Sequence, residues 1–270
     1  QKLSDTTGSS GYLSPQIFPC TSINEKDVVF GGVKKLESTI ANALKVIDAD
    51  LYVVLTGCIP EIVGDDVADV VSKFSDAEKP VVFAPTAGFK GNNYKGHEQV
   101  VEAIVTQYLK KSDDKQKGLV NIWADVPYQD LFWLGNIREL ENLLTEIGLT
   151  PNTIFGYQRG IENINKIPHA EFNLLVSPWV GLKNMKTMEK TLGIPYLHYP
   201  VLPVGATETG KFLREVGKFA NIDEEKVEAV IKKHEDYFYY LISRYADLFL
   251  ENRVINKQFS VVADAQYSLA

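Results

Sequence analysis

The sequence predicts an α/β protein with Rossmann-like, doubly wound parallel sheets, and three observations lead to this fold class. Short runs such as 51–55 and 80–85 are apolar throughout, as strands are when helices cover both faces of a parallel sheet. Apolar residues in 33–47 and 137–147 recur at helical spacing. Strand-like and helix-like segments alternate with short connections, which is typical of right-handed βαβ units.

The first half of the chain shows this alternation twice. We expect a helix over 33–47, a strand at 51–55, a helix over 65–74 and a second buried strand at 80–85. The loop 86–96 then leads into a helix whose apolar side includes Val100, Ile104 and Leu109. The charged run 110–118 is the best candidate for a linker.

The second half repeats the alternation and then changes character. The pattern predicts strands at 119–123, 152–156, 172–177 and 195–199, and helices over 137–147 and 182–192. A long amphipathic stripe follows from Asn221 to about residue 252, and Asn221 with Glu224 gives it a capping box. It is too long for a crossover helix, so we interpret it as an inter-domain or oligomer helix. His234 lies in this stripe, where packing is the preferred interpretation.

The end of the sequence indicates a division into domains. Residues 257–270 resemble a short apolar strand followed by the start of a helix, as if a further βα unit opens there. We therefore expect a fragment of a longer protein. Its predicted parts are a partial first Rossmann-like domain (1–115), a second such domain (116–206), a helical connection (207–256) and the start of a truncated third domain (257–270).

Composition narrows the class of protein. The chain has 270 residues, 45% of them hydrophobic, and a net charge of −7, which argues against a nucleic-acid partner. It has no apolar run of the roughly 18 residues that a membrane span requires. Two cysteines cannot form a disulfide framework, so we expect a cytoplasmic protein.

Cys58 is the residue that most invites a chemical role. It follows the predicted strand 51–55, and ligands of open α/β sheets gather at the carboxyl ends of strands. Gly57 allows a close backbone approach, and a thiolate there suits iron–sulfur ligation or nucleophilic chemistry. The competing interpretation is a small, inert, buried side chain, as most free cysteines are. The four histidines lack metal-ligand spacing, and the glycines of 88–96 lack the spacing of a dinucleotide fingerprint.

Three segments together identify a family resemblance. "NEKDVVFGGVKKLESTI" (24–40), "LTGCIPEIVGDDV" (55–67) and "TAGFKGNNYKGHEQVVEAIV" (86–105) resemble the nitrogenase component 1 superfamily. The order VFGG, C-x-x-E-x-x-GDD and GF-x-G-x-x-x-x-G is specific, and the resemblance continues through 174–179, 193–216 and 259–270. It implies a fold of three Rossmann-like domains around a metal-cluster site, with the segment that supplies the earlier cluster cysteines missing before residue 1.

The resemblance also implies site residues. Cys58 falls on a cysteine that ligates an iron–sulfur cluster between two homologous subunits, with Gly57 and Gly88 beside it, whereas Cys20 falls on no cluster position. The acidic pair Asp65-Asp66 is expected to start the next helix, where carboxylates are favoured. Ser177 stands where catalytic α subunits carry a cofactor cysteine, and the Pro178-Trp179 pair and the four-residue gap between Gly91 and Gly96 resemble β-type subunits. The gap length implies that His97 matches a bulky β-type residue without function; the alternative is a role beside the cofactor, as in α-type chains.

These implications give two functional hypotheses and a third without metal. The first is a β-like subunit of a nitrogenase-like oxidoreductase that relays electrons through an iron–sulfur cluster of the 4Fe–4S or P-cluster type, with Cys58 as one ligand. Its partners would be a homologous α-type subunit, in a heterotetramer, and an ATP-dependent iron–sulfur reductase protein. This fragment alone is expected to be inactive and to lack the cluster. The second is a non-catalytic scaffold for cofactor assembly, and the third a fragment that merely folds.

Overall fold

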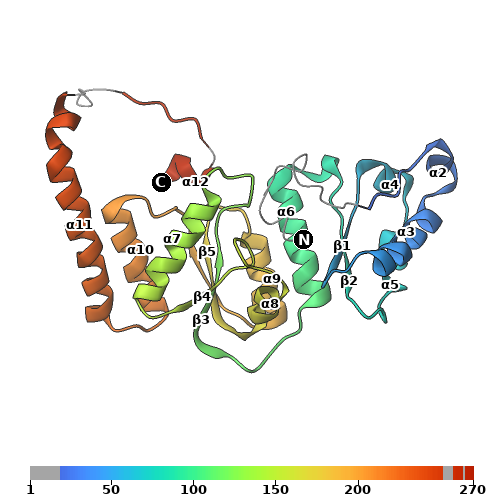
Figure 1. The fold of residues 1–270 in the computed structure, drawn as a ribbon, viewed down its shortest axis with the longest axis horizontal. Coiled ribbons are helices and arrows are strands. Elements are labelled where there is room, and N and C mark those ends of the chain that lie inside the picture. The colour runs from blue at the N-terminus through green and yellow to red at the C-terminus, as the bar shows by residue number, and fades with distance from the viewer. Residues whose placement is uncertain (1–18, 252–257, 264) are drawn as a thin grey trace. The chain divides into compact units, whose positions relative to one another are not determined.

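The structure is a computed structural model that describes residues 19–251, 258–263 and 265–270. The chain divides into two compact units (Figure 1). The first unit contains the described residues up to 111 together with 154–168 and 186–193, and the second contains 112–153, 169–185 and the described residues from 194 on. The first change of unit lies between residues 111 and 112, inside the charged run 110–118.

Helices and strands alternate along most of the chain. In order they are α2 (Glu25–Phe30), α3 (Val33–Val46), β1 (Tyr52–Leu55), α4 (Cys58–Val63), α5 (Val67–Ser72), β2 (Val81–Ala84), η1 (Gly88–Lys90), α6 (Asn93–Ala103), the π-helix η2 (Ile104–Tyr108), β3 (Gln116–Trp123), α7 (Trp133–Glu146), β4 (Thr150–Asn152), α8 (Ile161–Lys166), η3 (Ile167–His169), β5 (Ala170–Val176), α9 (Leu182–Leu192), β6 (Tyr196–Tyr199), α10 (Gly205–Phe219), α11 (Glu224–Glu251) and α12 (Ala265–Leu269).

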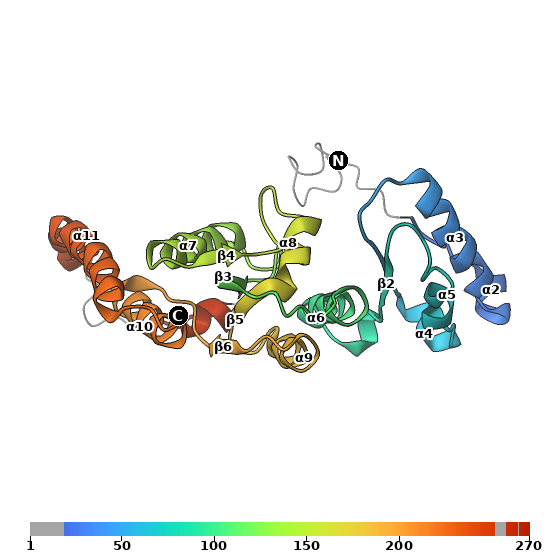
Figure 2. The same ribbon diagram turned by 90° about the horizontal axis from the view of Figure 1, so that it is seen from below.

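The first unit is built on the parallel pair β1–β2, with Tyr52 opposite Val81 and Leu55 opposite Ala84. Helices α3, α4 and α5 lie on one side of β2 and α6 on the other (Figures 1 and 2). Apolar side chains of α3, α5 and the two strands form its core: Ile40, Val67, Val70 and Val71, with Leu36, Leu44, Val54, Val81 and Phe83 packed around them. Burying this apolar area from water is what holds the helices against the pair.

The second unit contains a four-stranded parallel sheet in the order β4-β3-β5-β6. Side chains at Val120, Ile122, Phe172 and Leu174 point to one face, where α7 and α10 lie side by side and α11 packs outside α10 (Figures 1 and 2). The other face carries a ladder of amides across three strands. Asn152 Nδ2 donates to Asn121 Oδ1 at 2.8 Å, and Asn121 Nδ2 donates to Asn173 Oδ1 at 3.0 Å. The predicted class of parallel, doubly wound α/β fold is confirmed.

Several element boundaries differ from the sequence prediction. The strand predicted at 152–156 instead spans Thr150–Asn152, because Gly156 has a positive φ of 121° and the chain has already left the sheet. Helix α11 begins at Glu224, with Asp223 Oδ1 accepting from the Glu225 amide at 3.1 Å, and Asn221 has a left-handed φ of 52° that does not suit a helix cap. The capping box at Asn221 was therefore wrong.

The predicted strand near the chain end is also wrong. Residues 258–263 are described and form no strand, and Val262 is fully exposed there. A strand is stable only when its backbone groups pair with a neighbour, and this segment has no such neighbour among the described residues. The helix that follows does form, as α12. The four-part domain scheme stays a prediction.

Candidate functional site

Cys58 lies where the sequence placed it, just beyond the carboxyl end of a parallel strand. Strand β1 ends at Leu55, Gly57 precedes the short helix α4, and Cys58 is its first residue. The thiol is free and exposed. The interpretation of Cys58 as a small buried side chain is therefore wrong.

Two glycines leave space around this thiol. A Cβ added at Gly88 would lie 3.5 Å from the Cys58 Sγ, so the η1 turn passes directly beside the sulfur. At Gly57 an added Cβ would meet no described atom within 4 Å, and its φ of −90° suits any residue. Gly57 thus borders open space, and Gly88 is the glycine in close approach.

Hydrogen bonds join the loop that carries Cys58 to the loop that carries Gly88. The Thr86 amide donates to Thr56 Oγ1 at 3.0 Å, and the Thr86 hydroxyl donates to the Thr56 carbonyl at 3.1 Å. Glu61, one turn along α4 from Cys58, accepts from the Thr56 hydroxyl and from Lys90 Nζ. Partial burial alone would raise the pKa of Glu61, but the hydrogen bonds from Lys90 and Thr56 outweigh it, so this pKa lies below its usual value. Glu61 is thus held as a carboxylate.

The two acidic residues after α4 have different tasks. Asp65 receives the Gly32 amide on both carboxylate oxygens, each at 3.0 Å, and a Cβ at Gly32 would lie 2.8 Å from Asp65 Oδ2. Asp66 caps α5 by accepting from the Asp69 amide at 2.9 Å. The expected role at the start of the following helix therefore holds for Asp66. Asp65 instead links the GDD segment to the double glycine of VFGG.

Exposed apolar side chains occur in the same short elements as Cys58 and Gly88. Leu55, Ile59, Ile62 and Phe89 are 50–73% exposed although they lie in β1, α4 and η1, within four residues of Cys58 or one residue of Gly88. Helix α2, which packs on α4, adds Val29 and Phe30, 73% and 80% exposed. Clustered exposed apolar residues of this kind mark protein interaction surfaces more often than free surface.

A cavity of about 750 Å³ opens on the same side of the first unit. It is lined by the segment 19–23, by α3, by β1 and by the turn 56–60, and both Cys20 and Cys58 contribute to its wall. Cys20 is exposed, and its Sγ accepts from the Ser22 amide at 3.4 Å. Its place in this wall is something the sequence did not predict.

The corresponding end of the second sheet is closed. Ser177, just after β5, is fully buried, and its hydroxyl has no hydrogen-bond partner among the described residues. Its amide donates to the Tyr199 carbonyl at 3.2 Å, and its carbonyl lies 2.7 Å from His198 Nε2. Asp125, just after β3, is buried as well, and burial raises its pKa to about 6. Sequence reasoning missed Asp125, whose one signal was an acidic residue after a strand.

His97 contacts an aromatic ring, and His234 contacts a carboxylate of a neighbouring helix. The His97 ring lies 5.3 Å from the Phe155 ring, and burial lowers the pKa of His97 to about 4, so it is neutral at physiological pH. His234 Nε2 lies 3.0 Å from Glu146 Oε2, which joins α11 to α7 by a polar contact rather than by apolar packing alone.

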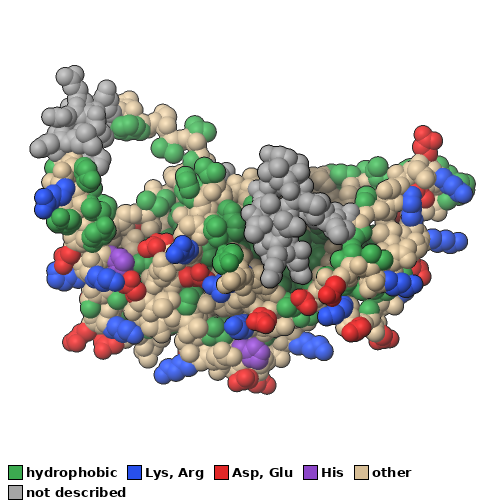
Figure 3. Space-filling view, in the orientation of Figure 1, with side chains coloured by type: hydrophobic (Ala, Val, Ile, Leu, Met, Phe, Trp, Pro, Cys, Tyr) green, Lys and Arg blue, Asp and Glu red, His purple; other side chains and the backbone are tan. Residues whose placement is uncertain are grey.

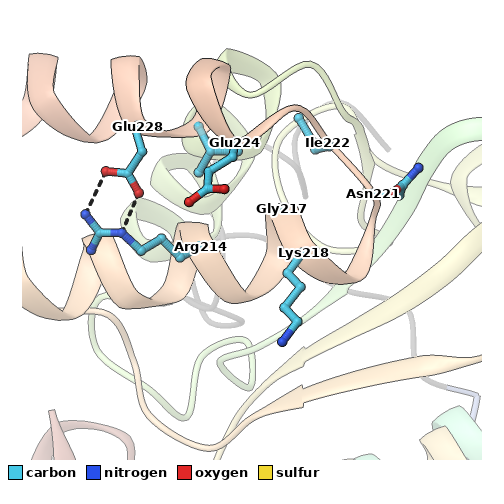
Figure 4. Close-up of a pocket in the computed structure, with 8 residues that line it drawn as sticks. Arg214, Gly217, Lys218, Asn221, Ile222, Glu224 and Glu228 are labelled. Carbon is cyan, nitrogen blue, oxygen red and sulfur yellow. Dashed lines mark hydrogen bonds and ion pairs between the residues drawn. The ribbon is translucent and has the colours of Figure 1, made fainter.

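A second cavity, of about 450 Å³, lies between α10 and α11 in the second unit (Figure 4). Arg214 binds Glu228 across it through Nε–Oε1 and Nη2–Oε2 hydrogen bonds of 2.6 and 2.8 Å. Near Gly217 the two helices approach so closely that a Cβ there would lie 2.7 Å from Val227. The Arg214–Glu228 pair and the close approach at Gly217 thus join α10 to α11 beside this cavity.

Two thiols, those of Cys58 and Cys20, line the cavity at this site, and the described residues hold no larger set of metal ligands there. No group of three or more His, Cys, Asp or Glu residues is arranged to hold a metal ion in 19–251, 258–263 and 265–270. One exposed thiol beside an open space fits a cluster whose other ligands come from elsewhere. Of the helices described, none is both long and apolar enough to cross a membrane.

The surface of the molecule shows how the side-chain types are distributed. Lys, Arg, Asp and Glu side chains are interspersed over the visible face, with no large area of one charge (Figure 3). Several ion pairs account for part of this mixture, among them Lys73 with Glu37 and Lys232 with Asp236. The visible face therefore offers no extended basic surface for a polyanion, in agreement with the net charge of −7.

Comparison with known proteins agrees with the resemblance in the sequence. The family described as nitrogenase component 1 type oxidoreductase matches residues 9–270. A light-independent protochlorophyllide reductase subunit from Angiopteris evecta is 28% identical over 221 residues, covering 78% of this chain and 42% of the relative. The same subunit from Pleurastrum terricola is 27% identical over 217 residues, covering 77% and 42%.

The fold has solved counterparts too. The structure "Nitrogenase Cp1 at pH 6.5" superposes with a TM-score of 0.68 at 23% identity, covering 88% of this chain and 44% of that one. The chain spans about two-fifths of the length of the curated relatives it matches.

Proposed function

We propose, starting from the premise that the chain belongs to the nitrogenase component 1 type oxidoreductases, that it is part of a reductase subunit in which Cys58 ligates an iron–sulfur cluster. The cluster, of the 4Fe–4S or P-cluster type, would take electrons in and pass them to a reducible substrate held with a partner subunit. Iron–sulfur clusters bound by thiolates supply such one-electron steps over a wide range of potentials. Gly57 and Gly88 would leave room for it.

The observation that carries this proposal is the exposed Cys58 thiol, whose neighbours in β1, α4 and η1 include the exposed apolar residues Leu55, Ile59, Ile62 and Phe89. A thiolate is the preferred protein ligand for iron–sulfur clusters, but a cluster normally requires about four ligands. The described part of this chain offers no group of three or more such ligands. The remaining ligands would come from the rest of the protein and from a homologous α-type subunit that covers Leu55, Ile59, Ile62 and Phe89.

The same proposal assigns the partners. A heterotetramer with the α-type subunit would bury these exposed apolar side chains, and an ATP-dependent iron–sulfur reductase protein would deliver the electrons. We place the protein in the cytoplasm, where thiols stay reduced. The named relatives are reductase subunits, which favours the reductase over an assembly scaffold.

The test is the iron content of the anaerobically purified complex of the full-length protein with its partner. Cys58→Ala should lower iron and acid-labile sulfide together, because one ligand of the cluster is lost. Cys20→Ala is the matched control, since Cys20 is an exposed thiol in the same cavity wall. Equal iron in both variants would remove Cys58 from the site.

A further inference from the structure

The Glu61 carboxylate contacts both loops at the Cys58 thiol. Its Oε1 accepts from the Thr56 hydroxyl, two residues before Cys58, and from the Ala87 amide at 3.4 Å. Its Oε2 forms an ion pair with Lys90. Ala87 and Lys90 stand on the two sides of the Gly88-Phe89 turn, so Glu61 holds that turn at both ends.

These bonds are partly shielded from water. The Glu61 side chain is 13% exposed, and Thr56 and Ala87 are buried. Charge-assisted hydrogen bonds are shorter and stronger than neutral ones, and partial burial protects them from screening by salt. Thr56 is satisfied from both directions, because its hydroxyl donates to Glu61 while it accepts from the Thr86 amide.

We propose that Glu61 is a positioning residue that fixes the Cys58 thiol against the Gly88 turn. The Thr56 contact sets the start of α4, on which Cys58 is the first residue, and the Ala87 and Lys90 contacts set the turn that passes 3.5 Å from the Sγ at the Cβ position of Gly88. Without the carboxylate the two loops keep the Thr56–Thr86 hydrogen bonds but lose the Ala87 and Lys90 contacts that hold the Gly88-Phe89 turn. The thiol geometry that a metal would meet therefore depends on Glu61.

This inference deepens the proposed function, but its test needs no metal. In the full-length chain with every cysteine except Cys58 changed to Ser, a nitroxide attached to Cys58 reports by electron paramagnetic resonance how firmly the site is held. Glu61→Ala should shift the spectrum toward the mobile component. Glu61→Gln, which keeps an acceptor for Thr56 and Ala87, should restore most of the immobile component, and Lys90→Met should give a shift between the two.

Two controls separate positioning from general loosening. A label at Lys45→Cys, on the exposed end of α3, should keep its spectrum in Glu61→Ala, and Lys73→Met, which removes the exposed ion pair of Lys73 with Glu37, should leave the Cys58 label unchanged. An unchanged Cys58 label in Glu61→Ala, or equal mobility gain at position 45, overturns the proposal. If Glu61→Ala does not fold, Lys90→Met decides: a shift of the Cys58 label toward the mobile component supports the proposal, and an unchanged label overturns it.

The outcome is separable from that of the proposed function. Loss of immobilisation in Glu61→Ala together with full iron in Cys58→Ala would keep the positioning role and remove the cluster ligand. Unchanged label mobility with iron lost in Cys58→Ala would do the reverse.

Discussion

Cys58 and Ser177 both follow the carboxyl end of a parallel strand, β1 and β5 respectively, but the first is exposed and the second is buried. Beyond β1, Cys58 is exposed, Gly57 borders open space, and apolar side chains face outward. Beyond β5, Ser177 is fully buried and its backbone is bonded to β6. The position in the fold therefore does not by itself make a site. The first end offers a soft ligand with access, whereas the second offers a hydroxyl without access.

The largest expected difference between the two ends is thiol reactivity. In a Cys20→Ser background, Cys58 should react with iodoacetamide at the rate of an open thiol. In Cys58→Ser with Ser177→Cys, the buried thiol should react about 1,000-fold more slowly, because it would wait for a local opening that costs about 4 kcal/mol. Similar rates at the two positions would break the comparison.

Truncating a core side chain beside the second sheet should cost much more unfolding free energy than truncating an exposed side chain beside Cys58. Phe212 is fully buried in α10 against the second sheet, so Phe212→Ala should cost about 3–5 kcal/mol of unfolding free energy. Ile62, 73% exposed beside the Cys58 site, should lose less than about 0.5 kcal/mol when changed to Ala. Chemical denaturation of both variants checks this, and a large cost at Ile62 would mean that its side chain is covered within the chain.

Much of the secondary structure could be predicted from the sequence, and the elements that could not be predicted have physical reasons. The apolar runs predicted β1, β2, β3, β5 and β6, and helical spacing predicted α3, α7, α9 and α11, because burial on one or both faces leaves a period in the residues. Helices α2, α4 and α8 were missed, since six residues show little of a period, although α5 of the same length was predicted within 65–74. Helix α10 was predicted only as part of the helical connection 207–256, without bounds of its own, although Phe212, Leu213 and Val216 have helical spacing.

The site was predictable in part. Cys58 at a strand end, the glycines and the GDD segment were visible in the sequence. Their contacts were not, because Gly32 with Asp65 and Thr56 with Thr86 lie 33 and 30 residues apart and meet through tertiary packing. The exposure of Cys58 and the burial of Ser177 also depend on neighbours that no local pattern encodes.

A substitution at Gly32, in the double glycine near the Cys58 site, should have a smaller effect on the unfolding free energy. Gly32→Ala would place a Cβ 2.8 Å from Asp65 Oδ2, so the carboxylate must move and its bonds to the amide weaken, at a cost of about 1–3 kcal/mol. Gly57→Ala, with open space and an ordinary φ, is the matched control and should stay within about 0.5 kcal/mol. Equal costs in denaturation would show that Asp65 does not require the glycine.

The smallest expected effect is an opposite response of the two units to acid. The folded-state pKa of Asp125 is raised to about 6, so its contribution to stability is present at low pH and is lost as pH rises through 6. The folded-state pKa of His97 is lowered to about 4, so its contribution is present above 6.5 and is lost as pH falls toward 4. Between pH 7 and pH 5 each should change stability by about 1–2 kcal/mol, in opposite directions.

Unfolding free energies at pH 5 and pH 7 test this. Asp125→Asn should remove the part that rises on acidification, and His97→Phe the part that falls. The same pH slope in both variants as in the parent chain would show that neither group is responsible.

The bond from the Gly32 amide to Asp65 gives the recognisable stretches of this sequence a second meaning. VFGG and GDD lie on either side of Cys58 in the sequence, but the hydrogen bonds from the Gly32 amide to Asp65 join them within the first unit. Their persistence in a lineage would thus be enforced by folding, independently of any metal. A descendant that exchanged Cys58 for another residue would still carry the same motifs and keep the same architecture. The two motifs therefore report common ancestry, whereas the residue at position 58 reports whether such a chain can bind a redox cluster.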